Sequence, residues 1–193
     1  MFGALFQSKS FRASSTNNSQ EALYACALRQ TRQPDFYLRW GVPDTFDGRF
    51  DLLLVHVFLI LYRLIDDPRY NKMSQDVFDV MFRDMDQTLR EHGIGDMGVP
   101  KHMKRMMIAF NGRMYTYLEA VQERDEKNAQ RALEKALARN LYGTIENPDL
   151  KALSCMALYM QDNIKYLNSV PVNDVIAGAI DFTGLDMQER KNG

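Results

Sequence analysis

The longest uncharged stretch of the chain lies between two charged residues, Asp51 and Arg63. It runs from residue 52 to residue 62, and His56 is its only strongly polar member. A helix over this stretch is apolar on every side and must therefore be covered on all sides. A membrane-spanning helix needs roughly 18 or more apolar residues, and this stretch is shorter. We therefore predict a central helix that is buried inside a helical protein, with no transmembrane helix.

Residues on both sides of the apolar stretch mark the ends of this central helix, which we expect over about residues 44–65. Gly41 and Pro43 interrupt whatever precedes it. Asp44 is the expected N-cap, because its carboxylate can accept a hydrogen bond from the first free N–H groups, and Asp47 adds negative charge to the first turn. At the other end, Pro68 disfavours helical dihedral angles for the residue before it.

Elsewhere the apolar residues recur at steps of three and four, which is the spacing of one face of a helix. The predicted helices are one from about residue 20 to before Pro34, one from an N-cap at Ser74 to Gly93, one from Pro100 to Val121, one over about 129–141, one that begins at Asn147-Pro148, and a short one around 172–180. No stretch alternates like a useful strand, and no second domain boundary is visible. We predict an all-α protein: a single compact helical domain, residues 21–184, of about six to eight helices around the central one.

The two ends of the chain differ from this pattern. Residues 1–20 are rich in Ser and Asn and contain Lys9 and Arg12 but no acid, which is typical of a flexible N-terminal tail. Alternatively, Met1, Phe2, Leu5 and Phe6 make a weak contact with a membrane surface or a partner, and the composition also allows a short targeting peptide. Residues 185–193 are predicted to be a C-terminal tail.

The composition narrows the class of protein. The chain has 193 residues, of which 46% are hydrophobic and 25% charged, as in ordinary globular domains. The formal net charge of −1 gives no electrostatic case for DNA or RNA as the main partner. Cys26 and Cys155 are the only cysteines, and they suit a reducing compartment rather than a disulfide framework.

The three histidines of the sequence are candidate sites of chemistry. None of His56, His92 and His102 has an acid three residues before or after it, so the Glu-x-x-His motif of di-iron bundles is missing. We therefore expect neither a metal centre nor a cofactor. His56 could act as the base of a small helical enzyme together with Asp51 or Asp47. A core histidine bonded to a neighbour is the favoured interpretation, because buried polar groups must be paired.

A small basic cluster opens the predicted helix after Pro100 and consists of Lys101, Lys104 and Arg105. One interpretation is a contact with the ribosome, RNA or anionic lipid, which would make the protein an adaptor at the membrane surface. A solvated helix face is favoured over this contact, because the overall charge does not support a nucleic-acid footprint.

Several blocks of sequence, in order, resemble the ubiquinol–cytochrome c chaperone family. They are residues 41–51 (GVPDTFDGRFD), 82–86 (FRDMD), 89–96 (LREHGIGD) and 109–113 (AFNGR) followed by Tyr117. The likeness extends over most of the chain, and the short length is similar to that of a bacterial-type member. The resemblance implies a non-enzymatic, all-helical assembly factor that protects newly made cytochrome b until it enters ubiquinol–cytochrome c reductase, that is, respiratory complex III.

The resemblance also implies partners and a location. Mitochondrial relatives act with a small helical co-chaperone near the ribosome exit tunnel, on the matrix side of the inner membrane. For this chain we accordingly expect cytochrome b as the client, and a location in the cytoplasm or peripherally on the inner face of the inner membrane. A small co-chaperone and the ribosome are further expected partners, and DNA is not one.

Charged residues gather at the predicted start of the central helix and are candidates for client binding. They are Asp44, Asp47, Arg49 and Asp51, and we expect Asp84, Asp86 and Arg113 close to them if the helices pack antiparallel. Such groups could hold the polar ends of a client's membrane helices. The alternative is that they cap helices and pair with one another, which alone explains acids at helix starts.

Overall fold

The structure is a computed structural model that describes residues 19–184. Its elements, in order, are α2 (Ser19–Thr31), α3 (Asp35–Leu38), α4 (Phe46–Leu64), the 3₁₀ helix η1 (Pro68–Tyr70), α5 (Asn71–Glu91), α6 (Val99–Val121), α7 (Glu126–Asn140), α8 (Leu150–Ser169) and α9 (Val172–Ile176). Residues 19–184 contain no strand, so the predicted all-α domain is confirmed. The predicted tails lie outside the described residues, apart from Ser19 and Gln20, which begin α2.

The predicted central helix is α4, and it is buried as expected. Every residue from Leu52 to Leu61 is at most 2% exposed. The helix packs against α2, α5, α6 and α8, so each of its sides has a neighbour. Because full burial of one such aliphatic or aromatic side chain contributes about 1.5–3 kcal/mol, α4 supplies much of the core's stability. Within residues 19–184, no helix is both long enough and apolar enough to span a bilayer.

The first turn of α4 is capped differently from the prediction. The side chain of Thr45, not that of Asp44, accepts a hydrogen bond from the backbone N–H of Gly48 at 3.1 Å. Asp44 lies one residue too early to reach the free N–H groups and instead pairs with Arg49. Asp47 is the acidic residue of the first turn, as predicted.

Two other predicted helix starts are also wrong, and a predicted helix end is confirmed. Ser74 is buried within α5, because Asp67 caps the preceding 3₁₀ turn and the chain continues from it into the helix. Asp149, rather than Asn147, caps α8. Gly93 has a φ of +79°, and the N–H of Ile94 bonds the carbonyl of Leu89, which is the glycine-ended helix terminus that the sequence predicted.

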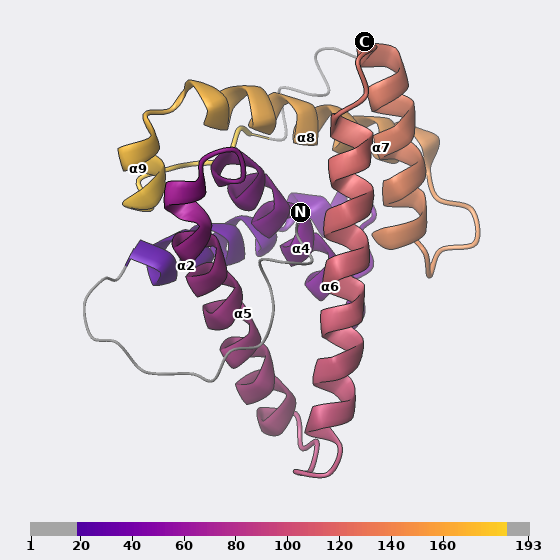
Figure 1. The fold of residues 1–193 in the computed structure, drawn as a ribbon. Coiled ribbons are helices and arrows are strands. Elements are labelled where there is room, and N and C mark those ends of the chain that lie inside the picture. Colours follow the sequence, from indigo (N-terminus) through magenta and orange to yellow (C-terminus); the bar gives the residue numbers. More distant parts are fainter. Residues whose placement is uncertain (1–18, 185–193) are drawn as a thin grey trace.

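The long helices α5 and α6 define the shape of the molecule. In Figure 1 they meet at the short loop between them and diverge from it, with α4 lying behind. At the far end α6 packs against α7, and α7 packs against α8. The first turns of α4 line two clefts, one shared with α6 and one with α2 and α5, and these clefts hold the candidate site.

Candidate functional site

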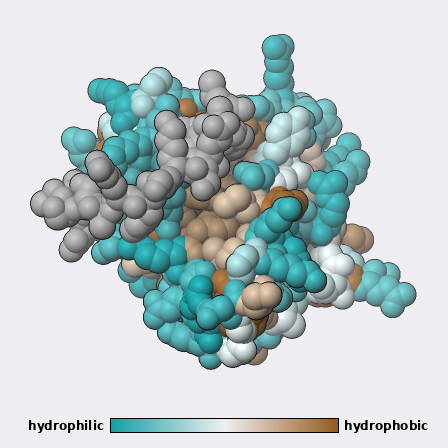
Figure 2. Space-filling model, turned by 60° about the horizontal axis from the view of Figure 1, so that its bottom comes forward, coloured by the Kyte–Doolittle hydropathy of each residue, from teal (hydrophilic) through white to brown (hydrophobic). Residues whose placement is uncertain are grey.

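Two adjoining clefts lie at the N-terminal end of α4, and together we call them the α4 groove. The first cleft, of about 650 Å³, is bounded by α4, α6 and the segment after α7. The second, of about 580 Å³, lies between α2, α4 and α5. Both are lined by Thr45, Phe46, Phe50 and His92, so the two clefts adjoin across these shared side chains. Figure 2 shows a hollowed, apolar middle surrounded by mainly hydrophilic residues on the face that includes the loop end of α5 and α6.

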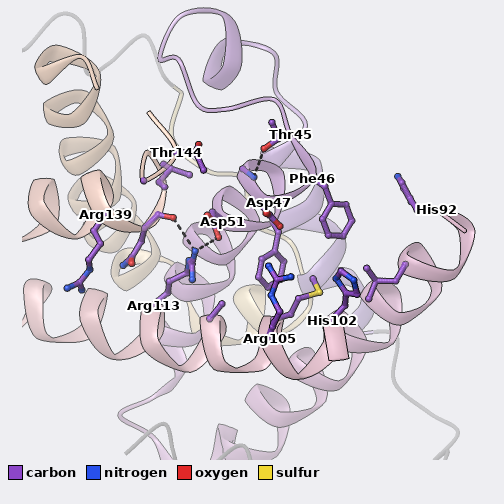
Figure 3. A pocket seen from close by; sticks show the side chains of 18 of the residues that line it. Thr45, Phe46, Asp47, Asp51, His92, His102, Arg105, Arg113, Arg139 and Thr144 are labelled. Atoms are coloured by element: carbon purple, nitrogen blue, oxygen red, sulfur yellow. Dashed lines mark hydrogen bonds and ion pairs between the residues drawn. The ribbon is translucent and has the colours of Figure 1, made fainter. Parts of the chain in front are cut away.

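An ion pair between α4 and α6 forms the floor of the first cleft (Figure 3). Arg113 contacts the carboxylate of Asp51 at 2.7 Å and donates a hydrogen bond to the backbone carbonyl of Asn140 at 3.3 Å. Both side chains are largely buried, with 20% and 13% of the Arg113 and Asp51 side chains exposed. Burial raises the pKa of Asp51 to about 6, although Arg113 opposes the rise. This pair therefore joins three segments of chain and includes a carboxyl group whose pKa is raised by burial.

The rest of the first cleft carries both signs of charge. Figure 3 shows Asp47 on the α4 side, Arg105 on the α6 side and Arg139 at the end of α7. Arg139 donates a hydrogen bond to the hydroxyl of Thr116 at 3.1 Å. His102 completes the α6 wall. The cleft therefore offers hydrogen-bond donors and acceptors around a partly apolar surface.

The second cleft has its own paired charges. Asp44 pairs with Arg49, whose guanidinium lies over the ring of Tyr37 at 5.1 Å from the ring centre. Across the cleft, the hydroxyl of Tyr24 donates a hydrogen bond to Asp84 on α5. Asp44 and Arg49 thus pair with each other, as in the alternative that the sequence left open, whereas Asp84 is bonded to a tyrosine.

An aromatic pair marks the boundary between the clefts. The rings of Phe46 and His92 meet edge to face with their centres 5.7 Å apart. Phe46 is 38% exposed, although it belongs to a helix that is otherwise largely buried. An exposed aromatic ring between two clefts is well suited to contact an apolar partner segment.

The turn from Pro43 to Gly48, which forms one wall of the first cleft, depends on the glycine. A Cβ atom at this position would lie 2.1 Å from the carbonyl oxygen of Pro43 and 2.9 Å from its Cβ. The backbone would have to move, so Gly48→Ala should lower the free energy of unfolding by about 2 kcal/mol. Urea denaturation measures this loss. In the matched control Gly112→Ala, where the added Cβ meets open space, stability should rise by about 0.5–1 kcal/mol. An equal effect of both substitutions would contradict the role of the close approach.

Most of the charged residues singled out from the sequence line the groove. They are Asp44, Asp47, Arg49, Asp51, Asp84, Arg105 and Arg113. Asp86 does not line it, and pairs with Arg90 on α5 instead. Lys101 and Lys104 are exposed on α6 outside the lining, so a ribosome or lipid contact of the basic cluster stays a prediction.

The sequence did not single out Phe46, His92, Arg139 and Thr144 as parts of this groove. Arg139 and Thr144 come from the end of α7 and the loop after it, far from α4 in the sequence. For His92 there was a signal in the sequence, because it lies in the block 89–96 that resembles the family.

His56 is completely buried and lines neither cleft. The hydroxyl of Thr31 donates to the carbonyl of Ala27 at 2.8 Å, so it accepts from Nδ1–H of His56 at 2.9 Å. Nε2 then accepts from the hydroxyl of Tyr159 at 3.1 Å. Burial lowers the pKa of His56 to about 3, which keeps it neutral. This dry, fully bonded histidine gives no support to an enzyme that uses it as a base.

Among residues 19–184, no group of three or more His, Cys, Asp or Glu side chains is arranged to hold a metal ion. The groove is lined by groups that pair with one another or face solvent.

Comparisons with known proteins agree on one family. The family model described as "Ubiquinol-cytochrome C chaperone" matches residues 38–182. The proteins named ubiquinol-cytochrome c reductase complex assembly factor 1 of Mus musculus and Homo sapiens are each 27% identical over 158 residues, covering 80% of this chain and 50% of theirs. The chain thus spans about half the length of these two relatives. The Xenopus laevis protein is 24% identical over 155 residues, covering 80% of this chain and 74% of its own.

A solved structure is similar as well. The crystal structure of the Cbp3 homolog from Brucella abortus matches with a TM-score of 0.74 and 33% sequence identity. The match covers 87% of this chain and 90% of that one. The helical arrangement around the groove is therefore found in a related protein of similar length.

Proposed function

Because the chain belongs to the ubiquinol–cytochrome c chaperone family, we propose that it is an assembly factor for ubiquinol–cytochrome c reductase that binds newly made cytochrome b in the α4 groove. The mouse and human relatives are named for the assembly of that complex. The groove is the observation that carries the proposal. The protein would act in the cytoplasm or peripherally at the inner face of the membrane where its client is inserted.

The groove has the chemistry that a membrane-protein client requires. Its boundary exposes Phe46, which can contact apolar side chains, and the largely buried Phe50, Leu89 and Met106 add an apolar lining. Its walls carry Asp47 and Arg105, which can bond the polar ends of a membrane helix. A newly made membrane segment exposes both kinds of group before insertion, and neither kind alone would match it.

A photo-crosslinking residue in place of Phe46 tests this proposal inside cells that synthesise cytochrome b. The matched control carries the same residue at Leu150, which is 80% exposed and lies outside the groove. Illumination should join cytochrome b to the Phe46 position and give at least about tenfold less product at Leu150, because crosslinking requires contact. Mass spectrometry of the products identifies the client.

Two results would count against the proposal. Equal crosslinking of cytochrome b from both positions would remove the groove as its binding site. Unchanged cytochrome b levels and unchanged reductase activity after deletion of the gene would remove the assembly role itself.

A further inference from the structure

One face of α6 points directly away from the core. The exposed residues of this face follow the helix at steps of three and four: Lys101, Lys104, Ile108, Gly112, Tyr115 and Glu119. The buried residues Met106, Phe110, Met114 and Tyr117 lie on the opposite side of the same helix. Figure 1 shows α6 running along the near side of the molecule. This helix therefore has one face in the core and another in solvent along most of its length.

The middle of the exposed face carries two large apolar side chains beside the polar Asn111. Ile108 is 63% exposed and Tyr115 is 60% exposed, two turns further along the helix. Between them lies Gly112, and a Cβ built there would meet no atom within 4 Å. Two large apolar side chains with a glycine between them form projections and a gap, which is a surface into which another helix can pack closely.

The two ends of the face carry opposite charges. Lys101 and Lys104 lie at the start of α6, and neither forms a salt bridge with another residue of the described range 19–184. Glu119 lies four turns beyond Lys104, and its carboxylate accepts a hydrogen bond from the hydroxyl of Tyr115, which raises the pKa of that tyrosine. The face is therefore basic at one end, apolar in the middle and acidic at the other end.

This order of groups is complementary to itself when two helices run antiparallel. With a twofold axis between Asn111 and Gly112, Lys104 and Glu119 lie equally far from the axis in sequence, as do Ile108 and Tyr115. A lysine of one copy then meets a glutamate of the other, and an isoleucine meets a tyrosine, twice each. An isologous interface requires this kind of self-complementary patch.

We propose that the exposed face of α6 is the interface of a homodimer, in which the α6 helices of two copies pack antiparallel about Gly112. We choose a second copy of this chain as the partner because, in the antiparallel arrangement, each charged or apolar group of the face meets a complementary group of the same face on the other copy. A single helix pair buries little area, so the dimer should be weak, with a dissociation constant of roughly micromolar. The inference is independent of the identity of the client.

Charge reversal tests the proposal with the full chain in analytical ultracentrifugation. Lys104→Glu alone and Glu119→Lys alone should each weaken self-association by about tenfold or more, because each places two pairs of like charges in the interface. A mixture of the two variants should form a heterodimer with wild-type affinity, since each then supplies the charge that the other needs. Lys151→Glu, an exposed lysine on α8, is the control and should dimerise like the wild type.

Circular dichroism confirms that each variant is folded before its association is measured. A wild-type protein that stays monomeric at about a hundred times the expected micromolar dissociation constant would overturn the proposal. So would self-association that is unchanged in Lys104→Glu, or a mixture of the two variants that stays monomeric although the wild type dimerises. These results leave the client proposal untouched, because crosslinking from Phe46 is measured separately.

Discussion

Replacement of Arg113 by methionine should lower the free energy of unfolding by about 3 kcal/mol at pH 7.5. Methionine fills a similar volume along the wall of α6 but cannot pair with Asp51 across the floor of the groove. The Asp51 side chain is only 13% exposed, so its carboxylate would remain largely desolvated without a partner. Urea denaturation of the two proteins in the same buffer measures the loss.

The loss should depend on pH. The pKa of Asp51 is already raised to about 6 by burial, and without Arg113, which opposes the rise, it should increase further. At pH 5 this carboxyl group carries a proton in both proteins, so little charge is left uncompensated and the difference should shrink to about 1 kcal/mol. The double variant Arg113→Met with Asp51→Leu should recover most of the stability at pH 7.5, because an apolar pair replaces the ion pair. An identical loss at both pH values would show that Arg113 acts by packing alone.

The central helix could be predicted because its sequence leaves few alternatives. Eleven residues without formal charge, closed by Asp51 and Arg63, are too few for a bilayer and too apolar for a surface helix. Its exact start could not be predicted, because Asp44 and Thr45 are both good N-caps. The helix begins at Phe46, so Thr45 is the residue directly before it, and its side chain accepts the hydrogen bond from the N–H of Gly48.

The groove could be predicted only in part, for a similar reason. Asp47 and Asp51 are neighbours on one helix, so their common location followed from the sequence. Antiparallel packing led only to the expectation that Arg113 lies near this cluster, and its specific pairing with Asp51 at 2.7 Å was not predicted. Asp86 was expected nearby, but it lies two residues after Asp84 on α5, which turns its side chain to a different side of the helix. That Arg139 lines the groove could not be predicted, because its position depends on how α7 packs, which the pattern of apolar residues does not specify.

Replacement of His56 by phenylalanine should lower stability at neutral pH and raise it in acid. At pH 7.5 the hydroxyl of Tyr159 loses its acceptor inside the core, at a cost of about 2 kcal/mol. The new ring keeps an aromatic group beside Phe36 and Phe182, which now face the imidazole at 5.3 and 5.1 Å between ring centres. Chemical denaturation across a pH series measures the effect.

The higher stability of His56→Phe relative to the wild type in acid follows from the lowered pKa of His56. Its folded value of about 3 lies below the ordinary 6.5, so its contribution to stability is complete above pH 6.5 and is lost as the pH falls toward 3. That loss is about 1.4 kcal/mol per pH unit in the wild type and absent in the variant. The two stability curves should therefore cross near about pH 5, and curves that stay parallel down to about pH 4 would contradict a buried neutral histidine.

Substitution of Asp51 gives a matched variant, because its carboxyl group changes the stability with pH in the opposite direction. Its folded pKa of about 6 lies above the ordinary 3.8, so its contribution is complete below pH 3.8 and is lost as the pH rises through 6. Between about pH 6 and 4 the wild type thus gains stability from Asp51 while it loses a similar amount from His56. In Asp51→Asn the free energy of unfolding should fall more steeply with decreasing pH than in the wild type, because only the loss from His56 remains. In His56→Phe it should rise with decreasing pH, because only the gain from Asp51 remains. Opposite slopes in these two variants, measured against a nearly level wild type, would assign one titration to the core and the other to the floor of the groove.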